Sequence, residues 1–219
     1  MDLMNQDNIV HVFLNTLGDI IITNLLFILC CIPVITIGPA LTALYHCMLK
    51  VVKGNSYQIS KTFFRAFKEN FIQSLVVWIG IVFFGLILFL NIRFLLQEGT
   101  GMSKMFFYLS GLLFALLVII FLYIFPVIAA FANTLKNLLM HALFFSFRHF
   151  LYTLIIAVVT IFPMYMTYHD LKLMPLYACC WFFFGFGLTA YVNSHLLYKM
   201  FKPYLGEEEE DVEEESEAF

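Results

Sequence analysis

The stretch IPVITIGP, residues 32–39, decides how the first apolar segment of the chain folds. It lies within residues 20–49, which carry no formal charge. As one helix these residues would measure about 45 Å, more than the hydrocarbon core of a bilayer at about 30 Å. A proline disfavours helix in the residue before it and suits the first turn of a new helix. The sequence therefore predicts one helix ending near Pro33, a short break, and a second helix from about Pro39 to Val52.

The composition of the chain places it in a membrane. Of its 219 residues, 62% are hydrophobic, 12% are charged and 27 are phenylalanine. A soluble domain is closer to about half apolar and about a quarter charged, and a soluble fold of this size could not cover so much apolar side chain. The composition excludes a soluble globular enzyme, a disordered chain, a secreted disulfide scaffold and a nucleic-acid-binding domain.

Four further runs without a formal charge follow the first, at residues 70–92, 105–135, 149–169 and 173–198. Each reaches the length of about 20 residues that a membrane-spanning helix needs. Helices are expected because backbone groups in lipid must satisfy one another, and these runs lack the alternation of barrel strands. The predicted fold class is an all-α polytopic transmembrane helix bundle with five spans. If residues 17–52 form a hairpin, the number of spans is six.

The basic residues at the ends of the spans predict the orientation. Nine of the 12 Lys and Arg residues lie in the connections 50–70 and 136–148 and in the C-terminal flank, and three lie on the other side. Cytoplasmic loops carry the excess of Lys and Arg. We therefore expect loop 50–70 and the C-terminus in the cytoplasm. The N-terminus lies outside with five spans and inside with six.

The chain reads as one membrane domain, residues 1–205, followed by an acidic tail, residues 206–219. Nine of the 15 acidic residues lie between Glu207 and Glu217. Like charges repel there and nothing apolar is available to bury, so a disordered cytoplasmic tail is expected. Within the membrane domain, residues 17–96 and 105–168 resemble each other weakly, each with Pro-Val-Ile after an apolar run. Transporter folds are often built from such repeats, although short apolar segments also match by chance.

Residues 59–71 form the clearest amphipathic element. The apolar face holds Ile59, Phe63, Phe67 and Phe71, and the opposite face holds Lys61, Arg65 and Lys68. Such a helix lies in the membrane interface, where basic residues meet anionic headgroups, or it packs on the cytoplasmic face of its own protein. Candidates for a cytoplasmic interaction surface are Phe64, Arg65, Lys68 and Asn70.

No motif in the chain indicates catalysis, a metal or a cofactor. The five predicted spans contain no Asp, Glu, Lys or Arg, so they offer no carboxylate for proton coupling. No pair among the six His residues has a metal-binding spacing, and four of the five Cys residues form two adjacent pairs, which rarely bridge. We expect a protein that is not an enzyme and holds no cofactor. A channel lined by backbone carbonyls remains an alternative.

Two segments resemble the YesL family of bacterial multi-pass membrane proteins. NLLFILCCIPVITIGPALTALY, residues 24–45, matches the family's N-L, P-x-x-T-x-G-P-A and A-x-Y signature, and FFRAFKENF, residues 63–71, looks like its F-x-x-x-F-K-x-N-F segment. With the span pattern, the resemblance covers roughly residues 8–200. It implies a small protein of the bacterial plasma membrane, without established catalytic activity. Genes of the family commonly neighbour carbohydrate ABC importers and sensor-kinase systems.

The residues and the resemblance together favour a non-catalytic integral membrane accessory protein. Its expected partners are the lipid bilayer and the permease subunits of a carbohydrate ABC import system, whose assembly, stability or gating it would support; nucleic acid is not expected. The alternatives are an independent small-solute transporter or channel, and a membrane partner of a sensor kinase. The broken helix, whose small residues permit close helix approach, supplies the candidate structural or docking residues. They are Pro33, Thr36, Gly38, Pro39 and Tyr45.

Overall fold

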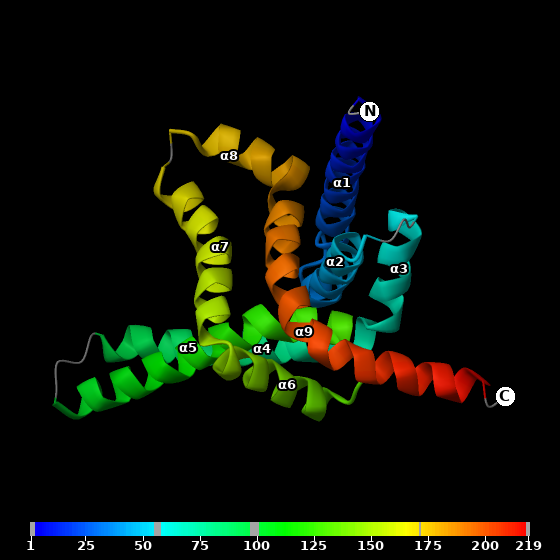
Figure 1. Ribbon diagram of the computed structural model, residues 1–219. Helices are drawn as coiled ribbons and strands as arrows, with labels where there is room; N and C mark the ends of the chain where they lie inside the picture. Colours follow the sequence, from blue (N-terminus) through cyan, green and yellow to red (C-terminus); the bar gives the residue numbers. More distant parts are fainter. Residues whose placement is uncertain (1–2, 55–57, 97–100, 171, 218–219) are drawn as a thin grey trace.

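The computed structural model describes the backbone of residues 3–54, 58–96, 101–170 and 172–217, and the side chains of residues 12–54, 58–96, 104–170 and 172–204. Every regular element in these ranges is helical, which confirms the all-α class. In chain order (Figure 1) they are α1 (Leu3–Cys30), the 3-10 turn η1 (Val34–Thr36), α2 (Ile37–Val52), α3 (Ile59–Glu69), α4 (Phe71–Leu95), α5 (Gly101–Ala130), α6 (Leu135–Arg148), α7 (Phe150–His169), α8 (Met174–Cys180), the π-helical turn η2 (Trp181–Gly185) and α9 (Phe186–Glu217).

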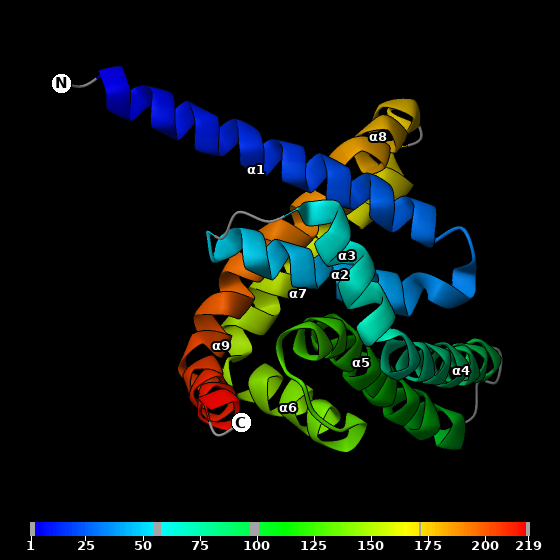
Figure 2. The ribbon, with the colours of Figure 1, turned by 90° about the vertical axis from the view of Figure 1, so that its right-hand side faces the viewer.

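Within the described residues, six helical segments are long and apolar enough to cross a membrane. They are Val12–Cys30, Val34–Val52, Phe71–Leu95, Lys104–Ala130, Phe150–His169 and Met174–Tyr204. The first two form the hairpin that the six-span alternative requires, because α2 runs back along α1 after the break (Figure 2). The expectation that no span contains a formal charge does not extend to this hairpin, since Asp19 lies inside the first segment.

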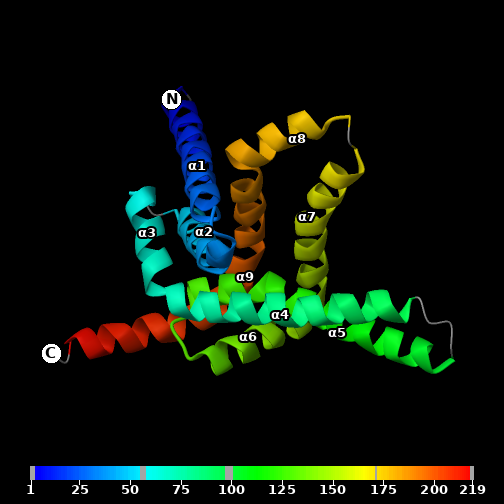
Figure 3. The ribbon, with the colours of Figure 1, turned by 180° about the vertical axis from the view of Figure 1, so that it is seen from behind.

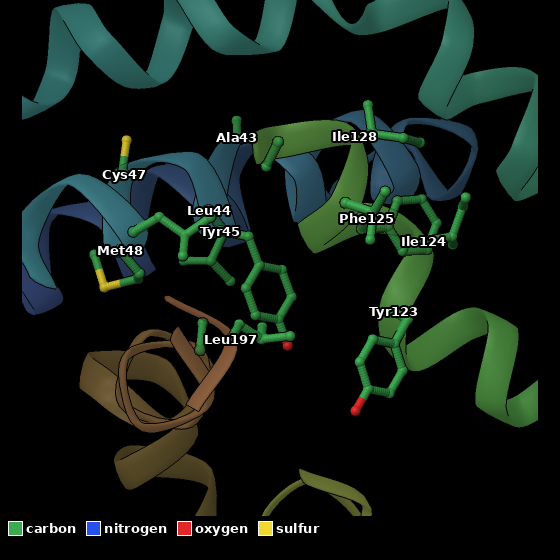
Figure 4. Packing of buried hydrophobic residues seen from close by; sticks show 14 of the residues in the cluster. Ala43, Leu44, Tyr45, Cys47, Met48, Tyr123, Ile124, Phe125, Ile128 and Leu197 are labelled. Carbon is green, nitrogen blue, oxygen red and sulfur yellow. The ribbon is translucent and has the colours of Figure 1, made fainter. Parts of the chain in front are cut away.

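Helix α2 occupies the centre of the molecule. Half of the residues in the apolar window of its candidate span are buried, compared with 6% of those in the window of α4. It packs against α1, α3, α4, α5 and α9. Figure 4 shows side chains of α2, among them Leu44 and Tyr45, between Leu197 of α9 and the end of α5 at Tyr123–Ile128. The short helix after the break is therefore the core element around which the longer helices are arranged.

Helices α4 and α5 pack side by side as an antiparallel pair that extends away from the rest of the molecule (Figures 1 and 3). The pair lies across the direction of α7 and α9 rather than parallel to it. Most of the large apolar side chains along α4 are exposed. These faces are covered by lipid or by another membrane protein, because water would not tolerate so much apolar surface.

The second half of the chain repeats the element order of the first only in outline. Pro126 lies inside α5 and does not break it, whereas Pro33 stands between two helices. The chain leaves helix five residues later, at 131–134, and continues into α6 and α7. Asn70 and His149 each stand at the boundary before the next long helix. The internal repeat stays a prediction.

The last membrane segment changes its helical geometry partway. It begins as α8, passes through η2, in which π-helical bonds widen the backbone, and continues as α9. Helix α9 extends to Glu217 in the structure, whereas the sequence predicts a disordered tail there. The side chains of residues 205–219 lie outside the described part of the chain, and the boundary between domain and tail stays a prediction.

Candidate functional site

Side chains bond to several backbone carbonyls at the break between α1 and α2. The Thr36 hydroxyl oxygen lies 2.6 Å from the carbonyl oxygen of Cys30 and 2.7 Å from that of Pro33. The Trp78 indole of α4 donates to the carbonyl oxygen of Val34 at 3.0 Å. Pro33 and Val34 are exposed and apolar. The break is thus held to α1 and to α4 without polar side chains at its surface.

Gly38 permits a close approach between α2 and α4. A Cβ atom at this position would lie 2.6 Å from both the Ser74 carbonyl oxygen and the Trp78 Cβ, distances that real Cβ atoms do not show. One turn further on, the hydroxyl oxygens of Thr42 and Ser74 lie 2.7 Å apart. Pro39 is buried in the first turn of α2. The small residues of the motif therefore organise packing inside the chain, and their role in docking a partner stays a prediction.

Tyr45 belongs to a separate buried polar cluster. The amide nitrogen of Asn193 in α9 donates to the Tyr45 hydroxyl at 3.4 Å and to the Thr160 hydroxyl of α7 at 3.0 Å. The side-chain oxygen of Asn193 is buried without a partner among the described residues. Tyr45 and Thr160 line an apolar cavity of about 170 Å³ that also reaches Phe125 and Trp181. This cluster ties α7, which is otherwise loosely packed, to the central helix.

Helix α3 packs its apolar face on its own protein, which was one of the two predicted alternatives. Ile59, Phe63 and Ala66 are buried, and α3 contacts α2 and α1. On the outer face, Phe64 is 42% exposed, and Arg65 beside it is exposed too, 3.9 Å from Glu69. We call this outer face the α3 docking face; its residues are Lys61, Phe64, Arg65 and Lys68.

A polar pocket of about 830 Å³ opens where α4 begins and α5 ends. We call it the junction pocket. It is lined by residues 128–134, at the end of α5 and in the link after it, and by residues of α2, α3 and α4. Its polar side chains are His46, Lys68, Glu69, Asn70, Gln73, Asn133 and Thr134. Of the predicted interaction residues, the structure therefore brings Lys68 and Asn70 together here, while Phe64 and Arg65 line a shallow hollow outside it.

Hydrogen bonds fix the walls of the junction pocket. The Gln73 amide donates to the Asn133 carbonyl oxygen at 3.2 Å, and Asn137 donates to the Asn133 side-chain oxygen at 2.8 Å. The His46 Nδ1 lies 2.9 Å from the Ala129 carbonyl oxygen. Because a carbonyl only accepts, His46 donates from Nδ1. The pocket thus offers donors and acceptors in a fixed arrangement.

Asn24 of α1, outside the junction pocket, holds the π-helical turn η2. Its amide nitrogen donates to the carbonyl oxygens of Trp181 and Phe182 at 3.1 and 2.7 Å, and its oxygen accepts the Gly187 N–H at 2.8 Å. A π-helical turn leaves backbone carbonyls without their usual partners, and such turns are frequent at functional sites. A Cβ atom on Gly187 would lie 2.8 Å from the Ile20 carbonyl oxygen, so this glycine lets α9 approach α1.

Sequence reasoning missed the junction pocket and the Asn24 contact. His46, Gln73 and Asn24 each read as a mild polar residue in an apolar run, because their partners lie far away in the chain. The hydrogen bond between Asn137 and Asn133 joins α6 to the non-helical link before it, since α6 begins at Leu135. Among the described side chains, no three His, Cys, Asp or Glu residues are placed to hold a metal ion. The arrangement is suited to reversible binding of a polar group.

The fold and the site define a multi-pass, all-α membrane protein with a broken N-terminal hairpin and a polar pocket at the ends of two spans. A family model described as "Protein of unknown function, DUF624" matches residues 20–92. The matched part runs from α1 through the break, α2 and α3 to α4, and covers roughly a third of the chain. Neither a curated protein nor a solved structure matches the chain.

Proposed function

We propose that the protein is a non-catalytic accessory subunit of the bacterial plasma membrane that binds another membrane protein in the cytoplasmic interface. The observation that carries the proposal is the α3 docking face. Its Phe64 ring is exposed between Lys61, Arg65 and Lys68. The helix behind it is anchored by Phe63, which is fully buried. A rigid aromatic side chain surrounded by cations is typical of interaction surfaces for acidic partners.

The resemblance to the YesL family indicates the class of partner. It extends beyond the matched residues 20–92 to most of the membrane domain, and it favours the permease subunits of a carbohydrate ABC import system. The exposed apolar faces of α4 and α7 support this proposal, because only small shares of their segments are buried, 6% and 11%. A permease subunit that contacts these faces would also reach α3, which leads directly into α4.

Co-purification tests this proposal. The protein is isolated at native abundance from its host's membranes in mild detergent, and the ratio of permease to protein is measured by quantitative mass spectrometry. We expect permease subunits in a fixed ratio. The double variant Lys61→Glu/Arg65→Glu lowers the recovered permease by about tenfold, because two charges that attract the partner are reversed. The control Lys172→Glu, on the other side of the membrane, leaves the ratio unchanged.

Equal recovery of permease with the double variant and the wild type would exclude the α3 docking face. Recovery of the protein alone, as a defined oligomer, would favour the second candidate function, an independent small-solute transporter or channel. The junction pocket and Asp19 within α1 are the observations that favour this alternative. Solute flux into liposomes that contain only the purified protein is its test.

A further inference from the structure

If α4 and α5 cross the membrane, the junction pocket lies at the level where lipid headgroups reside. Helix α4 begins at Phe71 and α5 ends at Ala130, and both are candidate spans. The pocket is lined by the first turn of α4 and the last turn of α5. Two adjacent spans that end together place their ends at one interface of the bilayer. The basic loop that contains α3 assigns this interface to the cytoplasmic side.

The pocket has a positive and a negative pole. Lys68 supplies a cation, and Asn70 and Gln73 also line the pocket. Glu69 supplies an anion, and the last carbonyls of α5 add partial negative charge. Of these carbonyls, Val127 accepts from Phe131 and Ala129 is taken by His46.

An apolar path leads from the pocket into the membrane. Ile72, at the rim of the pocket, is 74% exposed. Val76, Ile79 and Phe83 follow it on the same face of α4 at helical spacing, and all three are exposed. We call these four residues the α4 stripe. A hydrocarbon chain that starts at the pocket can lie along this stripe without crossing a polar side chain.

We propose that the junction pocket binds the headgroup of an ethanolamine phospholipid of the cytoplasmic leaflet, with one acyl chain on the α4 stripe. The phosphate accepts from Lys68 and from the amides beside it, and the ammonium donates to Glu69 and to the carbonyls at the end of α5. A choline headgroup lacks N–H donors, and a glycerol headgroup lacks the cation. Ethanolamine therefore satisfies both poles, and the site does not depend on the proposed partner.

Native mass spectrometry of the purified protein tests the headgroup. The protein is titrated in detergent with dioleoyl phosphatidylethanolamine, phosphatidylcholine or phosphatidylglycerol at equal concentrations. We expect a one-to-one adduct that is at least about fivefold more abundant with the ethanolamine lipid, since only this lipid makes charge-assisted hydrogen bonds at both poles. Equal adducts, or a preference for phosphatidylglycerol, would overturn the proposal.

Single substitutions on one helix test the poles. Lys68→Gln and Glu69→Gln each reduce the ethanolamine adduct by about fivefold, because each removes one charged partner. Glu69→Gln also removes the preference over choline. Lys172→Gln, an exposed position outside both the pocket and the α3 docking face, is the control and keeps the wild-type adduct. All three side chains are exposed, so the variants are expected to fold; identical behaviour of the three would contradict the proposed site.

A soluble competitor tests the acyl chain. Glycerophosphoethanolamine has the same headgroup but no chains, and we expect it to leave the lipid adduct intact at about tenfold excess, because it buries no apolar surface on the α4 stripe. Displacement of the lipid by this competitor would show that the headgroup alone binds, and would remove the stripe from the proposal.

Discussion

Gly38 is the residue at which a missing side chain decides how two membrane helices pack. The atoms that a Cβ would meet are the Ser74 carbonyl oxygen and the Trp78 Cβ, both close to the backbone of α4. Neither can rotate away, so even a methyl group has to separate the helices. The same approach brings Thr42 and Ser74 into hydrogen-bonding contact. Close contact of small residues and hydroxyl pairs of this kind is how helices associate in lipid.

We expect Gly38→Ala to destabilise the protein by about 1–3 kcal/mol, the usual effect of overpacking. The measurement is the midpoint of thermal unfolding in detergent. Size-exclusion chromatography of a fluorescent fusion monitors the unfolding. Gly80→Ala is the matched control on α4, where a Cβ atom would meet nothing within 4 Å. It should be neutral or stabilising, because alanine favours helix. If both variants melt like the wild type, α2 and α4 are not packed as closely as the structure shows.

Asn24 shows why single polar residues in apolar runs are hard to interpret. Its three hydrogen bonds all go to backbone atoms of Trp181, Phe182 and Gly187, more than 150 residues away. This side chain is needed because the backbone turn of η2 is wide. The π-helical geometry of η2 cannot be predicted from its sequence, WFFFG. A sequence can show that a polar residue is present, but its partner depends on which helices meet.

At the scale of elements, two neighbouring residues of α3 have different roles: one packs in the core and the other is available to a partner. Phe63 is buried between α3 and the central helices, whereas Phe64 faces outward. The rings of Phe63 and Phe64 meet edge to face with centroids 5.8 Å apart. The inner ring therefore supports the fold, and the outer ring is available to a partner.

We expect Phe63→Ala to affect the stability of the protein and Phe64→Ala to affect the recovery of the permease. Phe63→Ala should lower the free energy of unfolding by about 3–5 kcal/mol, because it leaves a cavity in the core. Phe64→Ala should change it by about 0.5 kcal/mol or less and should reduce the permease recovered with the protein. Thermal unfolding and co-purification are measured on the same preparations. A stable Phe63→Ala protein, or full permease recovery with Phe64→Ala, would contradict this division.

The elements that could be predicted from the sequence are those with local causes. The break at Pro33, the restart at Pro39 and the period of Ile59, Phe63 and Phe67 are set by residues within a few positions of one another, and the structure has each of them. The central position of α2 and the junction pocket could not be predicted. Both depend on contacts between distant helices, and apolar segments offer few features that distinguish one neighbour from another.

At the scale of the whole molecule, the contact between the break and α4 constrains the topology. Val34 accepts from the Trp78 indole, which lies about two turns into α4 and so about 10 Å from its start. If α4 begins at the cytoplasmic side, the break lies at a similar depth. Its exposed residues are apolar, with Val34 69% exposed. Thr36 and Trp78 bond to the carbonyl groups of Cys30, Pro33 and Val34. An apolar surface and internal hydrogen bonds to these carbonyls lower the cost of placing this irregular backbone at membrane depth.

We therefore expect the α1–α2 hairpin to enter from the cytoplasm and to turn within the membrane, with both of its ends inside the cell. Single cysteines are placed at exposed positions in a variant without its five native cysteines, as Val34→Cys, Ser60→Cys and Lys172→Cys. A membrane-impermeant maleimide applied to intact cells should label position 172 only, and position 60 should react after permeabilisation. Position 34 should resist the reagent from both sides, because lipid surrounds it. Labelling of position 34 from outside would show that α1 and α2 each cross the bilayer completely, and would place the break at the outer surface despite its apolar side chains.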